Sequence, residues 1–287
     1  MVSKLLVTFV LCICLPAAII GSPQDVAKII STAQERVRLT KRPILVVSDY
    51  NGVLVKKVKN EETPQKDMEF LRNEVLSPLT GAGHTAYVAS SKPAPKLQEL
   101  LGGVPQLGLS AEHNMMVKYP GSGRFHPTTI ESRTWETKLS QIKIPDGDGW
   151  KKKGEHQFST IIEFPPSYGG DRAQAYLKNE LRKVGATDYE AVLDKSKPQV
   201  MLAHTKRGKG DVVIQELTNH EFAHGVSFGD KVADEGMHKA MRAAGFHGVV
   251  VGGSPKEAQD NGFLHLSGPE EVHEVLRGLA QIRVESQ

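Results

Sequence analysis

Four short, mainly apolar runs constrain the fold of this chain more than any other feature of its sequence. The first of them shows none of the alternation of a half-exposed strand, and such a continuous run is typical of a strand buried on both faces of a sheet. Each run ends in polar residues or in glycine. The runs are Ile44–Val47, Ala86–Ala89, Val226–Phe228 and Val249–Val251.

Segments with helical character separate these runs, and this order predicts an α/β fold with a mostly parallel sheet. Helices are expected over residues 93–101, 210–217 and 234–244, and a last helix is expected to begin after Gly268. Pro269 and the acidic residues that follow it suit the first turn of a helix.

The stretch from about Val117 to Val200 differs in composition from the rest of the chain. Proline interrupts it repeatedly, and it contains both tryptophans, Trp135 and Trp150. We interpret residues 117–200 as an inserted α+β cap domain. The core domain is then expected in two parts, residues 36–116 and residues 201–287.

The amino terminus has the layout of a secretory signal peptide. Lys4 precedes an apolar run that is too short to span a bilayer, and small residues follow it up to Ser22. A buried first strand is the alternative, but the run shows neither turn nor alternation. We expect residues 1–22 to be removed and the protein to be secreted. Both cysteines, Cys12 and Cys14, would leave with them, so the core alone would stabilise the mature protein.

The net charge excludes some classes of partner. The whole chain carries +3, and removal of Lys4 lowers this by one. So small a charge argues against general binding to nucleic acid or to a membrane surface. The oligomeric state is left open by the sequence.

Residues that could carry chemistry lie at or after the predicted strand ends. Open parallel sheets bind ligands at the carboxyl ends of their strands, so distant residues can share one site there. Taken singly, each is an ordinary turn, helix-cap or solvated residue. Their order along the chain favours a functional interpretation. They are Asp49, Ser90, Lys209, Asp230 and Asp234.

These residue types match the needs of phosphoryl transfer. A carboxylate such as Asp49 can attack phosphorus and form an aspartyl-phosphate. Asp49 and Asp230 are the oxygen ligands that Mg²⁺ prefers, and the cation neutralises the phosphate dianion. Ser90 can donate a hydrogen bond to the phosphoryl oxygens, and Lys209 can supply positive charge.

Five segments resemble the motifs of the trehalose-6-phosphate phosphatase branch of the haloacid-dehalogenase superfamily. Ser48–Leu54 resembles the first motif, DYDGTL, and Val88–Lys92 resembles VSGR. Lys209 with Gly210 matches the third motif, and Gly229–Glu235 matches GDDxTDE. Leu109–His113 resembles the AEHG segment, in which Asn114 replaces the glycine.

This resemblance implies a Rossmann-like core with an inserted cap, Mg²⁺ dependence, and hydrolysis of trehalose 6-phosphate or a related sugar phosphate. It also implies metal ligation by Asp49, by Asp230 and by the main-chain carbonyl at position 51. Asp234 would be a further ligand or would support the others. Asn51 is a departure, because the family has its acid/base aspartate there. Loss of such a group costs roughly 10²–10⁴ in rate.

The positions that align with the substrate-binding residues of the family depart further from its pattern. Its sugar- and phosphate-reading cap segments align with Glu155, His156, Glu163, Phe164 and Pro165. Met201 replaces the glutamate expected ahead of the motif-three lysine. Lys92 replaces an arginine, and Lys231 replaces an aspartate. The trehalose assignment is therefore weaker than the phosphatase assignment.

Three functions remain open at this point. The first is an active sugar phosphatase. The second is a secreted pseudophosphatase that binds a phosphorylated ligand or a protein partner without efficient turnover, which the change at Asn51 motivates. The third is a secreted interaction protein that keeps the fold as a scaffold.

Asn51 and Gly52 form a pair that is prone to deamidation. Deamidation after synthesis would create an aspartate at position 51.

Overall fold

The computed structural model describes residues 22–57, 63–128, 132–145, 149–153, 158–194, 197–205 and 207–284. The predicted signal peptide therefore lies outside the described residues, except for Ser22. Within the described ranges, none of the helices combines the length and the apolar character needed to cross a membrane.

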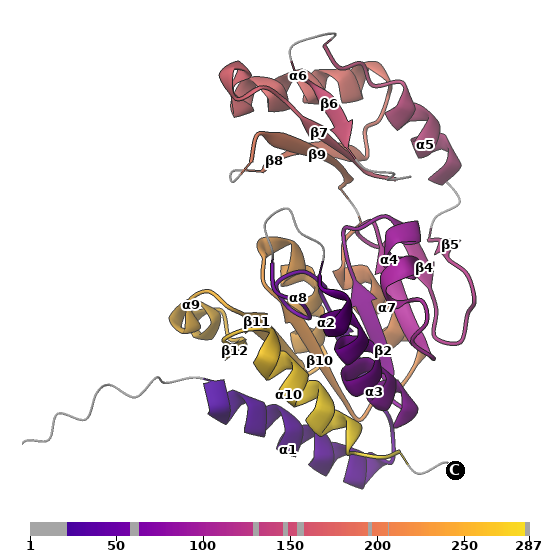
Figure 1. Cartoon of the computed structure of the whole chain (residues 1–287), viewed down its shortest axis with the longest axis vertical. Helices are drawn as coiled ribbons and strands as arrows, with labels where there is room; N and C mark the ends of the chain where they lie inside the picture. The colour runs from indigo at the N-terminus through magenta and orange to yellow at the C-terminus, as the bar shows by residue number, and fades with distance from the viewer. Residues whose placement is uncertain are drawn as a thin grey trace, which may run out of the picture.

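The larger sheet has eight strands in the order β12-β11-β10-β1-β2-β3-β4-β5 (Figure 1). The strands from β12 to β3 pair in parallel, and β4 and β5 add antiparallel pairs at one edge. The predicted α/β fold with a mostly parallel sheet is confirmed. The strands are β1 (Ile44–Ser48), β2 (Thr85–Ala89), β3 (Leu107–Ala111), β4 (Met116–Lys118), β5 (His126–Pro127), β10 (His224–Gly229), β11 (His247–Val251) and β12 (Leu264–Leu266).

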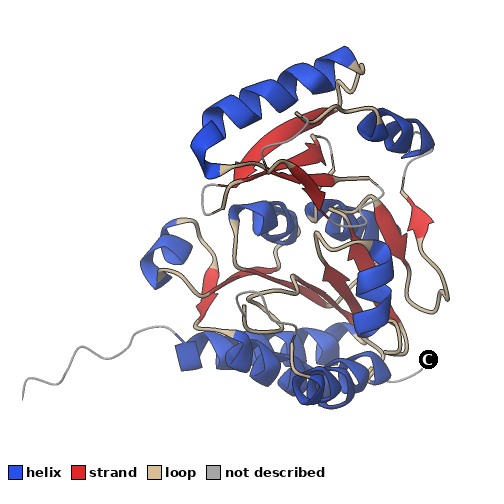
Figure 2. Ribbon diagram, turned by 45° about the horizontal axis from the view of Figure 1, so that its top comes forward, coloured by secondary structure: helices blue, strands red, loops and turns tan. Residues whose placement is uncertain are grey.

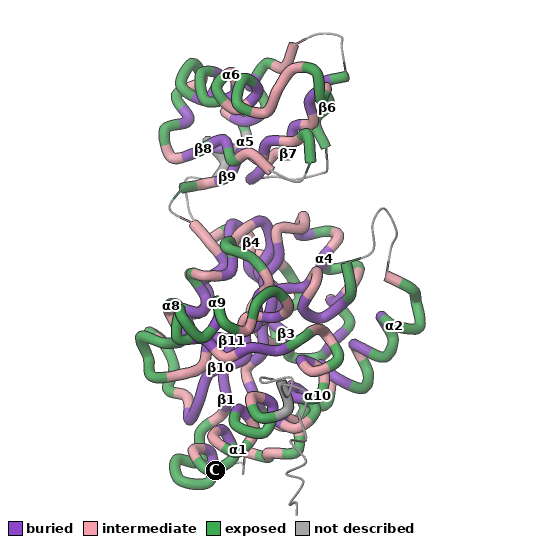
Figure 3. The backbone as a smooth tube through the Cα atoms, turned by 90° about the vertical axis from the view of Figure 1, so that its left-hand side faces the viewer, coloured by how far each residue is buried: buried purple, intermediate pink, exposed green. Residues whose placement is uncertain are grey.

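Helices cover both faces of this sheet (Figure 2), which is why its central strands are largely apolar. Val46 of β1 packs in one core with α1 and α10, while Leu45 and Val47 pack in another with α7 and α8. Figure 3 shows the buried strands between these layers. The helical segments are α1 (Ser22–Thr40), α2 (Gln65–Phe70), the π-helical η1 (Leu71–Leu76), α3 (Ser77–Gly81), α4 (Ala94–Leu101), α7 (Gly210–Asn219), the short η3 (Val232–Asp234), α8 (Glu235–Ala243), α9 (Pro255–Asp260) and α10 (Pro269–Ala280).

Helix α1 was not predicted, and it begins at Ser22, ahead of the expected core start at residue 36. Its apolar side chains recur at helical spacing and bury one face against the sheet and α10. The buried positions are Val26, Ile29, Ala33 and Val37. A cleavage site near Ser22 would leave this helix intact.

A second, antiparallel sheet has the order β6-β7-β9-β8 and its own apolar core, which contains both tryptophans. In Figure 1 it lies beyond one end of the larger sheet. Its elements are α5 (Ser132–Ser140), β6 (Lys151–Lys153), β7 (Thr160–Glu163), η2 (Pro166–Tyr168), α6 (Gly170–Lys183), β8 (Tyr189–Asp194) and β9 (Gln199–His204).

The expected cap boundaries of 117 and 200 do not follow these sheets. β4 and β5 extend the larger sheet to Pro127, because β4 turns back and pairs with β3. β9 continues the smaller sheet to His204. We therefore propose that the inserted unit begins between Thr128 and Ser132 and ends between His204 and Gly210.

A buried histidine is expected to make the stability of the fold depend on pH. His224 opens β10, is fully buried, and packs its ring against those of Phe246 and His247. Burial, together with the neighbouring His247 and Arg36, lowers the pKa of His224 to about 3. An unfolded histidine takes up a proton near pH 6.5, so folding disfavours protonation.

We therefore expect the free energy of unfolding to fall as the pH drops below about 6.5, by up to about 1.4 kcal/mol per pH unit from this group, until the folded pKa is reached. Urea unfolding at pH 7.5 and pH 5 measures this loss. His224→Phe should reduce the difference between the two pH values. His220→Phe, at an exposed position, is the matched control, and an equal reduction in both variants would contradict the assignment.

Candidate active site

The carboxyl ends of three neighbouring strands bring the predicted site residues together. β1 lies between β2 and β10, so Asp49, Ser90 and Asp230 follow strands that are adjacent in the sheet. The Asp49 N–H donates to the Phe228 carbonyl at 2.9 Å and continues the pairing past the end of β1. Lys209 lies just before α7, and Asp234 ends η3.

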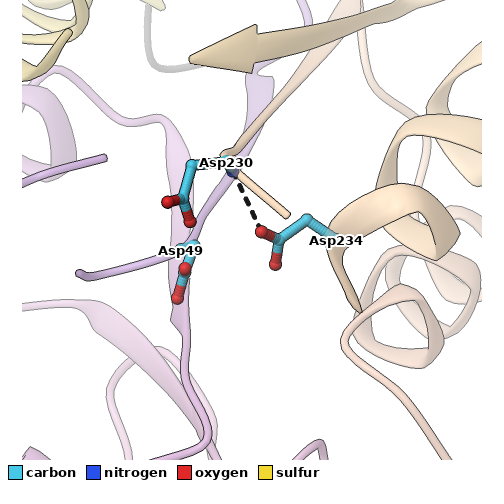
Figure 4. Close-up of side chains that lie close together, drawn as sticks. All are labelled: Asp49, Asp230 and Asp234. Carbon is cyan, nitrogen blue, oxygen red and sulfur yellow. Dashed lines mark hydrogen bonds between the residues drawn. The ribbon is translucent and has the colours of Figure 1, made fainter. Parts of the chain in front are cut away.

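Three aspartates form a compact acidic cluster at this edge (Figure 4). One carboxylate oxygen from each of Asp49, Asp230 and Asp234 lies within 4.8 Å of the other two. Asp49 is 3% exposed and Asp234 is fully buried. Buried carboxylates are costly unless cations or hydrogen bonds compensate them.

Lys209 compensates two of these carboxylates. Its Nζ lies 2.7 Å from Asp49 Oδ1 and 2.7 Å from Asp234 Oδ1. Burial by itself lowers the pKa of Lys209, but the charges of the two aspartates outweigh it and raise the pKa. The lysine is therefore a fixed positive charge inside the site.

Burial raises the pKa of Asp49, Lys209 opposes this effect, and Asp234 adds to it. Asp49 Oδ1 also accepts the N–H of Tyr50 at 2.7 Å. Both described contacts of this carboxylate therefore engage Oδ1. Oδ2 is the oxygen left to react with a ligand.

Asp234 holds the loop that carries Asp230. Its Oδ2 accepts the N–H groups of Asp230 at 3.0 Å and Lys231 at 3.1 Å, while Oδ1 accepts the ammonium of Lys209. A side chain in place of Gly229 would collide with Asp234. Asp234 thus supports the loop and the lysine, and both of its oxygens are already engaged.

Asp230 has the features of a cation ligand. Its Oδ1 is buried and has no hydrogen-bond partner among the described residues. Buried polar atoms are seldom left unpaired, so this oxygen indicates a missing partner such as a cation. Mg²⁺ prefers oxygen ligands and commonly uses one or two carboxylates. Asp49, Asp230 and the main-chain carbonyl of Asn51 therefore fit this ion.

Lys57 contacts the other oxygen of Asp230 and was not predicted from the sequence. The segment after β1 turns back at Gly52, whose φ is +85°. An added Cβ there would lie 2.6 Å from Asp230 Oδ2. The close turn brings Lys57 onto the carboxylate, and no local sequence pattern could have indicated that contact.

Replacing Lys57 with methionine is expected to tighten divalent-cation binding by up to about fivefold, because an ion pair with a half-exposed partner contributes about 0.2–1 kcal/mol. Titration calorimetry with Mg²⁺ or Mn²⁺ measures the change. Lys56→Met is the matched control, since Lys56 pairs with Glu270 instead. Equal affinities of the two variants would exclude competition by Lys57.

Asn51 and Ser90 flank the nucleophile candidate. Asn51 is half-buried and forms an isolated bridge with Val55. Ser90 is 2% exposed, and its Oγ accepts the N–H of Lys92 at 3.2 Å. In the parallel register Ser48 pairs with Val88, which sets Ser90 at the level of Tyr50.

Glu112 is a second residue whose role was not predicted, although the segment containing it was singled out. It is 1% exposed, and its Oε2 accepts the N–H groups of Phe158 at 2.6 Å and Ser159 at 3.1 Å. Glu112, His113 and Asn114 all have positive φ, a costly conformation for residues other than glycine. This strained turn ties the larger sheet to the chain entering β7.

Glu112→Ala is expected to leave two buried N–H donors unpaired and to cost roughly 2–4 kcal/mol of stability in the smaller sheet. Hydrogen exchange at Phe158 and Ser159 should accelerate, and the core strands should stay protected. Glu190→Ala, at an exposed position of β8, is the control. Unchanged exchange at both amides would contradict this role.

The positions aligned with the family's substrate-binding groups contact other residues of this chain where the structure describes them. Glu155 and His156 lie outside the described residues. Glu163 pairs with Lys153 at 2.5 Å, and Phe164 is buried against Trp150. Met201 Sδ lies 3.3 Å from His113 Nε2, across the two sheets.

Pro165 directly precedes η2. Lys231 lines a cavity of about 720 Å³ together with Asp194 and Ser254.

No family model matches the chain, and a search of curated proteins finds no match. Solved structures do match. Trehalose-6-phosphate phosphatase from Aspergillus fumigatus is 21% identical with a TM-score of 0.62, and the match covers 88% of this chain and 97% of that one. The C-terminal domain of the C. albicans enzyme is 17% identical with a TM-score of 0.66, covering 91% and 98%.

Sucrose-phosphatase from Synechocystis, in complex with sucrose and phosphate, is 16% identical with a TM-score of 0.50 and covers 84% and 98%. The chain thus has the fold shared by these sugar phosphatases, over nearly their whole lengths. The resemblance stated from the sequence motifs is confirmed at the level of the fold.

Proposed function

We propose that the protein is a Mg²⁺-dependent phosphatase that hydrolyses trehalose 6-phosphate or a related sugar phosphate through an aspartyl-phosphate. The observation that carries this proposal is the buried arrangement of Asp49, Lys209 and Asp234 beside an oxygen of Asp230 that has no hydrogen-bond partner among the described residues. The fold shared with trehalose-6-phosphate and sucrose phosphatases supports it.

In the first step Asp49 Oδ2 attacks the phosphorus, and the bond from phosphorus to the sugar oxygen breaks. Lys209 keeps the attacking carboxylate oriented through Oδ1 and adds positive charge beside the phosphoryl group. Ser90 donates its hydroxyl to a phosphoryl oxygen in this proposal. Mg²⁺, when bound by Asp49, Asp230 and the Asn51 carbonyl, neutralises negative charge on the phosphate.

The departing sugar oxygen needs a proton, and the second step needs an activated water. The amide of Asn51 is neither an acid nor a base near neutral pH, so in this proposal solvent water protonates the departing oxygen and accepts the proton of the attacking water. Water then attacks the aspartyl-phosphate, releases phosphate and restores Asp49. Turnover is therefore expected to be slow, by roughly 10²–10⁴ compared with a site that has an acid/base carboxylate.

Secretion also belongs to the proposal, and it rests on the pattern of residues 1–22. Amino-terminal sequencing of protein recovered from the medium of expressing cells tests it. A mature terminus between Ala18 and Ser22 is expected.

The activity test is phosphate release from trehalose 6-phosphate, sucrose 6-phosphate and glucose 6-phosphate, with Mg²⁺ and with EDTA. Hydrolysis that requires Mg²⁺ and prefers a disaccharide phosphate supports the full proposal. Hydrolysis without that preference supports a broader sugar phosphatase. Absence of hydrolysis from all three esters by the folded protein would overturn the proposed activity.

A further inference from the structure

A cavity of about 360 Å³ lies beside the candidate active site, between the segment after β1 and the helices α2, η1 and α4. Asn51 lines it, so the cavity adjoins the position expected to face the leaving group. Among the described lining residues, three side chains are cations and one is a carboxylate, Glu99. The cations are Arg72, Lys92 and Lys96.

All three cations are half-buried, although lysine and arginine are mostly exposed in proteins. Lys96 exposes 34% of its side chain, while its ion-pair partner Glu99 exposes 66%. The side chain of Lys96 is therefore more buried than that of Glu99, and both residues line the cavity.

Arg72 is held in place by its own helix. Its Nε donates to the carbonyl of Met68 at 3.2 Å, and it forms no ion pair with any described residue. A guanidinium can form two parallel hydrogen bonds with a phosphate or a carboxylate. Arg72 thus offers a planar anion-binding group on the wall of the cavity.

Tyr50 lines the same cavity as these cations. It is 1% exposed, and its hydroxyl lies 3.0 Å from the sulfur of Met68. Lys92 Nζ lies 5.3 Å from the centroid of the Tyr50 ring. Arg72 of η1 and Lys96 of α4 line the same cavity as this buried ring.

We propose that this cavity binds an anionic group, namely a phosphate, sulfate or carboxylate, through Arg72, Lys92 and Lys96. Two sources share this chemistry. One is a second anionic group on the substrate, which rests on the proposed phosphatase function. The other is a free inorganic anion, which does not depend on that function.

The binding test uses sulfate as the probe and the full chain in EDTA. Without a divalent cation, the aspartate cluster disfavours anions, so the cavity is the expected site. Titration calorimetry should give saturable binding with one sulfate per chain. Arg72→Gln and Lys96→Gln should each weaken it by roughly tenfold or more, the scale of a hydrogen bond to a charged group.

Lys66→Gln is the matched control, because Lys66 lies exposed on α2 and does not line the cavity. It removes the same charge from the same neighbourhood and should change the affinity little. Lys96→Arg should retain binding. Weakening by Lys66→Gln as strong as by Arg72→Gln, or no saturable binding at all, would overturn the site, and thermal unfolding confirms that the variants are folded.

A second arm identifies the source of the anion. Phosphate release is compared for a hexose 6-phosphate and for the same hexose with a second phosphate. A preference for the ester with two phosphates that Arg72→Gln removes assigns the cavity to the substrate. Sulfate binding without that preference assigns it to a free anion. If no ester is hydrolysed, the phosphatase proposal fails while the sulfate titration still tests the cavity.

Discussion

Replacing Asp49 with asparagine is expected to reduce phosphate release by about 10⁴-fold or more, the scale of a lost nucleophile. The amide nearly matches the carboxylate in shape, and Asp234 still pairs with Lys209, so the fold should be retained. The initial rate of phosphate release, measured with Mg²⁺ on the best substrate of the panel, gives the effect.

Asp67→Asn is the control for this variant, because Asp67 is an exposed residue of α2. Mass spectrometry of the acid-quenched reaction should detect a phosphorylated peptide containing Asp49 in the unmodified protein and none in Asp49→Asn. Activity of Asp49→Asn within tenfold of the unmodified protein would show that another group attacks the phosphorus.

Asn51→Asp is expected to raise kcat by roughly 10²–10⁴, because it restores a group that can donate and accept the proton of the reaction. The position is half-buried and two residues from Asp49, at the start of the segment that turns back at Gly52. The measurement is kcat as a function of pH. The variant should gain a dependence on a carboxyl group that the unmodified protein lacks.

Asn73→Asp, at an exposed position of η1, is the matched control. Peptide mapping must show asparagine at position 51 in the unmodified protein, since deamidation there would create the same residue. An unchanged kcat in Asn51→Asp would indicate that another group handles the proton. Activity that appears only in Asn51→Asp would instead favour a protein that binds phosphorylated ligands without turnover.

Much of the core could be predicted because its signals are local. The apolar runs of β1, β2, β10 and β11 and the helices α4, α7, α8 and α10 are found within a few residues of the predicted ranges. Burial on both faces of a sheet leaves a continuous apolar run, and that run can be recognised without knowledge of the partners. Helix α1 was missed because its apolar spacing follows directly on the amino-terminal apolar segment.

Some residues of the candidate site could likewise be predicted from the sequence, and others could not. Asp49, Ser90 and Asp230 could be proposed because parallel strands place their carboxyl ends at one edge. Lys57 and Glu112 could not be assigned roles, because their partners Asp230 and Phe158 lie far away along the chain. The boundaries of the inserted unit stay a prediction, since proline content does not report which strands pair.

The sequence by itself determined the parallel core and the residue types at its strand ends, because hydrophobic pattern and turn chemistry act over a few residues. Only the tertiary structure decided that Lys209 lies between Asp49 and Asp234, and that Asp230 keeps one oxygen buried without a described partner. It also brought Arg72 of η1 and Lys96 of α4 around one cavity. These contacts join distant segments, and chain packing alone sets the distances on which charge interactions depend.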